Sequence, residues 1–303
     1  MSFYLVTGGA GFIGSHVCEL LLAQGHRVRV LDNLSTGISE NLAEGVELFE
    51  ADICDLEAIR PAFTNIDGVF HLAAMPSVTM SIEDPMKTHL VNIDGTLNVL
   101  MAARDAKVKR LVYSASAAAY GNPTILPATT NMKADPLNPY ALQKFVGELY
   151  CKQFSLLFGL ETVSLRYFNA YGPRMADVGA YLNVISIFAQ QKRKGLPMTI
   201  FGDGKQTRDF VHVKDIARAN LEAMLSPAVD GGDVLNVGSG LSYSVNDVAD
   251  IMGGERAYLE NPRGKGDPAD SLADISETKQ KLGWEPSIAF ELGLKELMNL
   301  WKL

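Results

Sequence analysis

The sequence is poor in cysteine and has no long hydrophobic run, and each shortage excludes a class of protein. The three cysteines, Cys18, Cys54 and Cys151, stand far apart and lack the spacing of metal ligands. An odd number of isolated cysteines excludes a disulfide framework and predicts a reducing compartment. Two of them lie in apolar periodic stretches, where burial is expected. No apolar run reaches about 18 residues, and the first residues enter a predicted strand without a basic leader, so we expect a cytoplasmic protein without a membrane partner.

The chain also lacks an excess of positive charge. Its 27 lysines and arginines against 35 aspartates and glutamates give a net charge of −8. This balance disfavours a general attraction to nucleic acid or to an anionic membrane, so neither is expected as a partner. Any polyanionic ligand must instead be held by locally placed cations and backbone amides.

What the 303 residues do contain is an alternation of strand-like runs and helical patterns, with no internal repeat. This alternation predicts βαβ units, and therefore an α/β fold with a doubly wound parallel sheet covered on both faces. The strand-like runs are residues 3–7, 27–31, 46–50, 68–72, 110–114, 161–168 and 234–237.

Three glycines at three-residue spacing follow the first strand-like run. We expect Gly8 to turn the chain sharply, Gly11 to let the backbone approach a pyrophosphate, and Gly14 to let helix and strand pack closely. The phosphates would face the positive N-terminus of the following helix. The segment therefore predicts a dinucleotide site in a Rossmann-type sheet.

The second strand-like run ends at Asp32. An acidic side chain at this place accepts hydrogen bonds from an adenosine ribose and repels a 2′-phosphate, which favours NAD over NADP. The alternative interpretation is an ordinary helix-capping or turn acid.

Tyr140 and Lys144 stand four residues apart in a predicted helix, so their side chains share one face. An ammonium group beside a phenol favours the phenolate, and should lower the pKa of Tyr140 from its usual value of about 10. Such a tyrosine would serve as a base near neutral pH beside a nicotinamide. The alternative is a pair that only covers a helix surface.

The composition of the chain changes after Asn169, where proline and glycine become frequent. We predict an NAD-binding unit of residues 1–168 with about 211–238, because the strand-like run at 234–237 should return to the main sheet. A smaller, discontinuous α/β unit that binds the substrate would comprise about 169–210 and 239–303.

In combination these motifs resemble those of the extended short-chain dehydrogenase/reductases, and within that group the nucleotide-sugar 4-epimerases typified by UDP-galactose 4-epimerase. The resemblance covers nearly the whole chain. It rests on Tyr140, Lys144 and the segments Thr7–Ser15, Asp32–Gly37, Asp52–Ile53, His71–Ala74, Ser114–Gly121, Arg166–Asn169 and Gly202–Phe210.

The resemblance implies which residues bind NAD. Phe12, Ile13 and residues 32–37 would line the adenosine and phosphate site, Asp52 and Ile53 would meet the adenine, and Lys144 would also hold the nicotinamide ribose. The full implied set is Gly8, Gly11, Phe12, Ile13, Gly14, Asp32, Asn33, Leu34, Ser35, Thr36, Gly37, Asp52, Ile53, Leu72, Ala73, Ala74, Asn92, Ser114, Tyr140, Lys144, Tyr167 and Phe168.

The resemblance also implies a catalytic set of Ser116, Tyr140 and Lys144, with no metal. Ser116 would bond the reacting sugar oxygen; taken alone, it is a strand-end serine that caps a turn. The implied substrate-binding set is Ser116, Tyr140, Asn169 and Arg208 at the sugar and diphosphate, Thr199 and Phe201 at the uracil, Asp267 at the ribose, and Val245, Arg263 and Ser271.

Several substrate residues keep ordinary alternatives. Phe201 can be a core aromatic, Arg208 a surface ion pair with Asp209, and Asp267 a turn residue. The chain also departs from the family pattern at Gly264, where an arginine is usual, and Arg263 or Lys265 would have to replace it.

Two alanines indicate which reaction of these nucleotide-sugar enzymes the chain catalyses. Dehydratases carry an Asp-Glu pair where this chain has Ala117 and Ala118, and UDP-glucuronate decarboxylases carry a glutamate at position 118. We therefore predict NAD-dependent 4-epimerisation of a UDP-hexose through a transient 4-keto sugar. The alternatives are a UDP-glucuronate decarboxylase or another UDP-sugar-modifying enzyme of this fold, and a non-catalytic NAD-sensing protein.

Ser271 stands where the family has a residue at the sugar end of the pocket, and a small side chain there admits a 2-acetamido group. N-acetylated UDP-hexoses are therefore expected beside plain ones, whereas a C5 carboxylate would need a further cation or amide near Ala117 or Arg174. Family members commonly form homodimers through a helix pair, here residues 91–103 and 142–154, although burial against their own sheet gives the same pattern.

Overall fold

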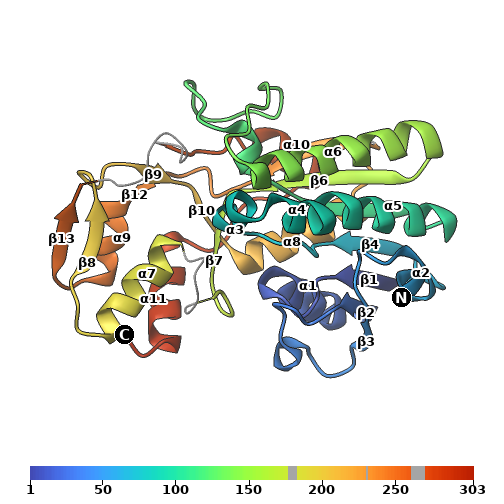
Figure 1. Ribbon diagram of the computed structural model, residues 1–303, viewed down its shortest axis with the longest axis horizontal. Helices are drawn as coiled ribbons and strands as arrows, with labels where there is room; N and C mark the ends of the chain where they lie inside the picture. The colour runs from blue at the N-terminus through green and yellow to red at the C-terminus, as the bar shows by residue number, and fades with distance from the viewer. Residues whose placement is uncertain (177–182, 230, 261–269) are drawn as a thin grey trace.

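The computed structural model describes residues 1–176, 183–229, 231–260 and 270–303 (Figure 1). Its main feature is a seven-stranded parallel sheet in the order β11-β6-β5-β4-β1-β2-β3. The strands are β1 (Phe3–Thr7), β2 (Arg27–Asp32), β3 (Glu47–Glu50), β4 (Gly68–His71), β5 (Arg110–Ser116), β6 (Glu161–Tyr167) and β11 (Asp233–Val237). The predicted doubly wound parallel sheet is confirmed, and strand ends differ from the predicted ones by at most two residues.

Both faces of the sheet are apolar, which is why its strands are nearly continuous hydrophobic runs. All five residues of β1 are buried; Tyr4 and Val6 belong to the core under α1 (Phe12–Ala23) and α8 (Val213–Leu225), whereas Phe3 and Leu5 belong to the core on the other face. That other core is covered by α2 (Leu56–Ile59), α5 (Thr96–Asp105) and α6 (Pro139–Phe158).

The chain returns to the large sheet late in the sequence. β11 pairs in parallel with β6, from Asp233 opposite Val163 to Val237 opposite Tyr167. The helix α10 (Ser276–Leu282) contacts β11 and α8, and Trp284 is buried in the same core. Residues 276–284 therefore pack on the large sheet although they lie within the range expected for the second unit. The domain division itself stays a prediction.

A second group of elements lies on the left in Figure 1 and has its own core of aromatic and aliphatic side chains. It contains three two-stranded sheets, pairing β7 (Asn169–Tyr171) with β10 (Phe210–His212), β9 (Thr207–Arg208) with β12 (Tyr243–Ser244), and β8 (Met198–Phe201) with β13 (Arg256–Leu259). The helices α7 (Val184–Arg193), α9 (Val245–Met252) and α11 (Phe290–Leu300) pack with them. A capping box of Ser244 and Asp247 starts α9.

Short helical segments connect the longer elements. They are η1 (Ser39–Asn41), η2 (Arg60–Phe63), α3 (Val78–Glu83), α4 (Pro85–His89), η3 (Leu90–Gly95) and η4 (Ala117–Tyr120). The segment η3 is a π-helical turn directly before α5, a feature that is frequent at functional sites.

The structure shows where the three cysteines lie and whether any described helix could cross a membrane. Cys18 and Cys151 are buried, as expected from their apolar surroundings, whereas Cys54 is exposed. Over the described ranges, no helix combines the length and the apolar character that crossing a bilayer requires.

Candidate active site

The predicted site residues come from the carboxyl ends of neighbouring parallel strands. Gly8 follows β1, Leu72 follows β4, Ser116 ends β5, and Asn169 follows β6. In an open parallel sheet these ends lie along one edge, where such folds bind their ligands. The strand order therefore brings together residues that are up to about 160 positions apart.

The glycine turn after β1 is shaped by close contacts. Gly8 has φ +70°, and a Cβ atom there would lie 2.7 Å from the backbone nitrogen of Ala73. A Cβ at Gly14 would lie 2.8 Å from the Cα of Gly9. The sharp turn at Gly8 and the tight packing at Gly14 are confirmed. At Gly11 a Cβ meets only the Gly8 carbonyl, at 3.2 Å, so its approach to a pyrophosphate stays a prediction.

Asp32 joins the glycine turn to the loop that follows β2. Its side chain is 8% exposed, and its two carboxylate oxygens accept hydrogen bonds from the backbone nitrogens of Ala10 at 3.0 Å and Leu34 at 2.9 Å. Each oxygen keeps further acceptor capacity. In the adjoining loop the Asn33 amide donates to Asp52 at 2.9 Å, which brings the two predicted adenosine-side segments together.

The loop after β4 lies against the glycine turn. The Leu72 nitrogen donates to the Thr7 carbonyl at 3.1 Å, and the Ala73 nitrogen donates to Thr7 Oγ1 at 3.2 Å. Asn92 holds the same loop, because its side chain accepts from the Met75 nitrogen at 2.8 Å and donates to the Met75 carbonyl at 3.2 Å and to Gln143 Oε1 at 2.9 Å. Asn92 therefore ties this loop to α6.

Tyr140 and Lys144 lie one turn apart at the start of α6. The helix begins with Asn138, whose side chain accepts from the Ala141 nitrogen at 2.9 Å, followed by Pro139 in the first turn. The Tyr140 nitrogen donates to Ser81 Oγ at 3.1 Å. Lys144 is 4% exposed. The predicted helical pair is thus present, with Lys144 enclosed and Tyr140 partly buried.

The electrostatics of the pair differ from the prediction. Burial raises the pKa of Tyr140, while the neighbouring Ser116 side chain acts in the opposite direction. Burial also lowers the pKa of Lys144 to about 8. The expected lowering of the Tyr140 pKa by Lys144 is therefore wrong for this structure, because removal from water disfavours the charged form of each group.

Ser116 has the capping role of a strand-end serine and also lies beside Tyr140, while its bond to a sugar oxygen stays a prediction. Its hydroxyl oxygen accepts from the Ala118 nitrogen at 3.2 Å and so caps η4, as a strand-end serine does. The same side chain lies within reach of the Tyr140 phenol and favours a lower pKa of that group. Ser116 therefore joins the end of β5 to the start of α6.

A cavity of about 240 Å³ opens beside Ser116. Six of the predicted residues line it, namely Ser116, Tyr167, Phe168, Asn169, Arg208 and Ser271. Sequence reasoning missed others that also line it: Val78, Pro123, Leu126, Leu137 and Asp270. These come from loops or short helices, where no periodic pattern marks them.

The polar wall of this cavity is held by a buried carboxylate. The Asn169 amide donates to the Asp209 carbonyl at 2.9 Å and to Ser271 Oγ at 3.2 Å. The Asp209 carboxylate is itself buried and accepts from the Ser239 nitrogen and hydroxyl and from the nitrogens of Gly240 and Ala273. Asp209 therefore positions Ser271 through the two loops that it joins.

Three predicted substrate residues, the two uracil-side ones and Val245, do not line that cavity. Thr199 is bonded on both its nitrogen and its hydroxyl to the side chain of Gln191, and Val245 is buried in the second core. Phe201 and Val245 are linked by Gln206, which donates to the carbonyl of the first and accepts from the nitrogen of the second. The predicted residues Arg263 and Asp267 lie outside the described residues.

The comparisons with known proteins identify the family of the chain. The family model described as "NAD dependent epimerase/dehydratase family" matches residues 4–238. The chain belongs to this family. A UDP-glucose 4-epimerase of Mycolicibacterium smegmatis is 37% identical to it over 98% of each chain.

Solved structures of UDP-sugar epimerases also superimpose closely on this chain. The chain superimposes with a TM-score of 0.92 on a UDP-N-acetylglucosamine 4-epimerase from Methanobrevibacter ruminantium, at 36% identity over 99% of this chain and 98% of that chain. The TM-score is 0.93 for a UDP-glucose 4-epimerase from Thermotoga maritima, at 37% identity over 99% and 98% of the two chains.

The residues of this family member fit a bound NAD. Gly8 and Gly14 permit the tight turn, because a Cβ at either position would meet backbone atoms. The first turn of α1 follows at once, and no side chain caps its N-terminus at Gly11. The Asp32 carboxylate stands at the end of β2, next to the turn. These features match the needs of a pyrophosphate and an adenosine ribose.

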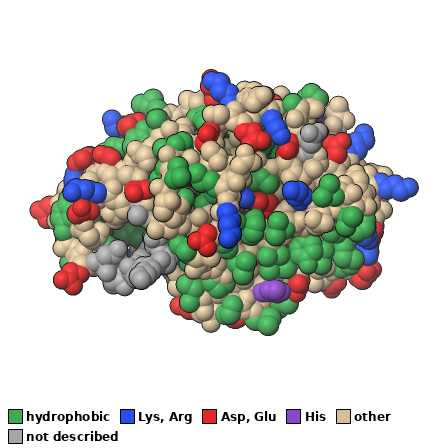
Figure 2. All heavy atoms as spheres, turned by 90° about the horizontal axis from the view of Figure 1, so that it is seen from above, with side chains coloured by type: hydrophobic (Ala, Val, Ile, Leu, Met, Phe, Trp, Pro, Cys, Tyr) green, Lys and Arg blue, Asp and Glu red, His purple; other side chains and the backbone are tan. Residues whose placement is uncertain are grey.

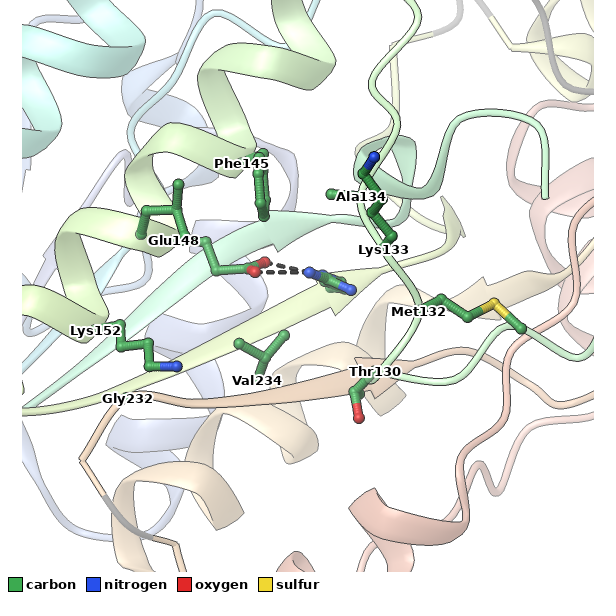
Figure 3. A pocket seen from close by; sticks show the side chains of 11 residues that line it. Thr130, Met132, Lys133, Ala134, Phe145, Glu148, Lys152, Gly232 and Val234 are labelled. Atoms are coloured by element: carbon green, nitrogen blue, oxygen red, sulfur yellow. Dashed lines mark hydrogen bonds and ion pairs between the residues drawn. The ribbon is translucent and has the colours of Figure 1, made fainter.

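A second hollow, of about 360 Å³, lies between α6 and the loop at residues 130–134 (Figure 3). It contains the buried ion pair of Glu148 and Arg166, with two hydrogen bonds of 2.6 and 2.9 Å. No predicted catalytic, cofactor or substrate residue lines it. Size alone therefore does not mark the site. Among the described residues, no group of side chains has the arrangement of a metal site.

Proposed function

We propose that this protein inverts the configuration at C4 of a UDP-hexose, with NAD as its cofactor. The observation that carries the proposal is the approach of Ser116 to Tyr140, which shares the start of α6 with Lys144. Ser116 also lines a cavity together with Asn169 and Arg208. The relatives named above are 4-epimerases of UDP-sugars, which supports the same reaction here.

Each catalytic residue has a specific task in this reaction. When bound, NAD supplies the reversible acceptance of a hydride from C4. Tyr140 Oη takes the proton of the C4 hydroxyl and later returns one to the same oxygen. Ser116 Oγ hydrogen-bonds that oxygen and keeps it next to the phenol. Lys144 is proposed to hold the nicotinamide ribose and, while charged, to stabilise the phenolate during the proton transfer; in the structure itself, the group that opposes the effect of burial on the Tyr140 pKa is Ser116.

Inversion also requires the 4-keto sugar to present its opposite face. A firm hold on the diphosphate with a loose hold on the hexose permits this turn. Asn169 and Arg208 are proposed to bind the diphosphate, since an amide and a forked guanidinium are suitable donors. The walls near the sugar are apolar, formed by Val78, Leu126 and Leu137, and fix no single orientation.

We propose neutral hexoses rather than hexuronic acids as substrates. A C5 carboxylate would need a further cation or amide near Ala117 or Arg174, and Arg174 itself is paired with Glu19 and donates to Ser15 Oγ at 2.9 Å. Ala117 and Ala118 offer no additional acid or base, which disfavours dehydration and decarboxylation. Decarboxylation of a UDP-hexuronic acid consequently ranks below 4-epimerisation and is kept as the second candidate.

We further propose that 2-acetamido sugars are accepted, because the residue at the sugar end of the cavity is the small Ser271. Replacing Ser271 by tyrosine should reduce kcat/KM for UDP-GlcNAc at least tenfold while UDP-glucose is less affected, since the larger ring fills the space of the acetamido group. Ser271→Ala is the matched control, because it keeps the space. Equal losses on both sugars would contradict this pocket assignment.

The decisive experiment is incubation of the purified protein with UDP-glucose, UDP-GlcNAc and UDP-glucuronate, followed by proton NMR. The expected products are the C4 epimers of the first two. Release of carbon dioxide and a UDP-pentose from the third would support the decarboxylase, and an absence of turnover with every sugar would support a non-catalytic NAD-binding protein.

We also propose a homodimer formed through α6. Leu142, Leu149 and Leu156 recur every seven residues and are exposed, and Leu90 is exposed on η3. Figure 2 shows hydrophobic side chains gathered over the right half of the face that it draws, where Figure 1 has α5 and α6. An apolar helical stripe of this kind commonly marks an interface. Light scattering should give a dimer for the wild type and a monomer for Leu149→Glu, with Lys152→Glu as the control.

A cytoplasmic location is proposed as well. It is supported by Cys18 and Cys151, which are buried as free thiols, as expected in a reducing compartment.

A further inference from the structure

Tyr113 has no role in the reaction described so far, yet it touches the helix that carries the catalytic pair. It lies in β5, three residues before Ser116, and is 1% exposed. The Nζ atom of Lys144 stands 5.0 Å from the centre of its ring. Its hydroxyl donates a hydrogen bond to the Lys144 carbonyl at 3.3 Å. One side chain thus contacts both the ammonium group and the backbone of Lys144.

α6 has a gap that admits this ring. Gly147, three residues after Lys144, faces Tyr113, and a Cβ there would lie 2.7 Å from the Cζ atom of the tyrosine and closer still to its hydroxyl oxygen. A glycine inside a helix costs about 0.5–1 kcal/mol relative to alanine. Its presence here is explained by the space that the phenol occupies.

The other groups near Lys144 do not supply a formal negative charge in direct contact with it. On β4, His71 is neutral, since burial lowers its pKa to about 3. On α6, burial raises the pKa of the Cys151 thiol and of the Tyr140 phenol, which disfavours the negatively charged form of each group. The Glu148 carboxylate is engaged by Arg166. The face of the Tyr113 ring is therefore the chief electron-rich surface beside the ammonium group.

We propose that Tyr113 is a positioning residue for Lys144. Its ring face holds the ammonium group on the side of α6 that carries Tyr140, and its hydroxyl fixes the backbone of the same turn. The ring contributes more than the hydroxyl to keeping Lys144 positioned and charged. The inference builds on the proposed epimerase function, in which Lys144 must be charged while Tyr140 gives up its proton.

The test compares two substitutions at position 113. Tyr113→Phe keeps the ring, and kcat should stay within about threefold of the wild type with an unchanged pH profile. Tyr113→Leu removes the ring, which disfavours protonated Lys144. Its kcat should fall about tenfold, and the alkaline limb of its profile should move to lower pH by about half a unit or more.

A direct readout separates this inference from the function on which it builds. The titration of Lys144 is followed by NMR in protein labelled with ¹³C at lysine Cε, with Lys144→Arg used for assignment. Tyr113→Leu should lower the midpoint, and Tyr113→Phe should not. A midpoint that moves in a protein without activity on any UDP-sugar would contradict the proposed function and leave the positioning role intact.

The matched control is Leu111→Ala, which removes buried volume from the same strand and the same core as Tyr113 but does not alter the ring beside Lys144. It should lower the melting temperature and leave the midpoint unchanged. If Tyr113→Leu behaves in the same way, the proposal is wrong. If Tyr113→Leu does not fold, Gly147→Ala decides, because its methyl group displaces the ring; an unchanged Lys144 midpoint in that variant also refutes the proposal.

Discussion

The two sides of the candidate site are built differently. On the side of the large sheet, Gly8, Asp32, Ser116 and Tyr140 stand at the ends of regular strands or at the start of a helix, and the repeating βα geometry places them. On the other side, Asn169, Arg208 and Ser271 stand on strands of two or three residues or in loops. Their arrangement depends on side-chain hydrogen bonds such as those of Asp209.

This difference indicates that the sheet side serves cofactor binding and proton transfer, whereas the other side serves substrate recognition. Cofactor binding and proton transfer need groups fixed within a fraction of an ångström, which rigid strand ends supply. Recognition of a sugar that must turn over needs less exact placement, and loops tied by a few buried groups can supply it. Variants on the first side should therefore affect chemistry and cofactor, and variants on the second should affect substrate affinity.

The largest effect is expected for Tyr140→Phe on the sheet side. Without the phenol no group transfers the C4 proton, so kcat should fall roughly 10²–10⁴-fold. Bound NAD, measured by absorbance after release, and the melting temperature should change little. Ser81→Ala, which removes the acceptor of the Tyr140 nitrogen and a hydrogen bond to the Val78 carbonyl but leaves the phenol in place, is the control and should keep most activity. Activity retained in Tyr140→Phe would refute the assigned base.

The second prediction concerns acid sensitivity on the same side. His71 bonds Thr7 Oγ1 at 2.7 Å and Thr96 Oγ1 at 3.0 Å, and burial lowers its pKa to about 3. Since the unfolded histidine titrates near pH 6.5, its contribution to stability is complete above that pH and is lost as pH falls toward 3.

By pH 4.5 this loss should reach about 3 kcal/mol of the free energy of unfolding, measured by urea denaturation. His71→Gln should flatten this part of the pH dependence, whereas His89→Gln, at an exposed histidine, should not. A wild-type protein equally stable at pH 7 and pH 4.5 would contradict the prediction.

A smaller effect is expected for Gly8→Ala. The methyl group meets the backbone of Ala73, and the positive φ angle is unfavourable for alanine, so stability should fall by about 1–3 kcal/mol. The displaced turn should also reduce bound NAD. Gly25→Ala is the control, because it has a similar φ of +78° with open space around the position. Equal NAD content in the two variants would argue against the predicted cofactor turn.

The smallest effect, and the sharpest test of the comparison, is expected for Asp209→Asn. The amide turns one acceptor into a donor that faces backbone N–H groups, which loosens the loops carrying Ser239 and Ala273. KM should rise about tenfold, with kcat and NAD content nearly unchanged. A loss of NAD instead would show that the two sides are not separable.

Local patterns predicted the sheet side well. The glycine spacing, the acid that ends the second strand and the i, i+4 pair each lie within a few residues, so the backbone periodicity alone relates their positions. The second side was predicted less completely. Asp270 and Leu137 line the cavity without any local signal, while Thr199 and Val245 lie apart from it. Those distances depend on how loops from separate segments meet.

The sequence by itself determined the parallel sheet, the dinucleotide turn and the chain positions of Tyr140 and Lys144, because hydrophobic period and glycine spacing act through the nearest neighbours along the chain. Only the tertiary structure decided the charge states around them. Burial raises the pKa of Tyr140, against the expectation from its spacing to Lys144, and it lowers the pKa of Lys144. Desolvation is set by all the atoms that exclude water from a group, and most of those come from distant parts of the chain.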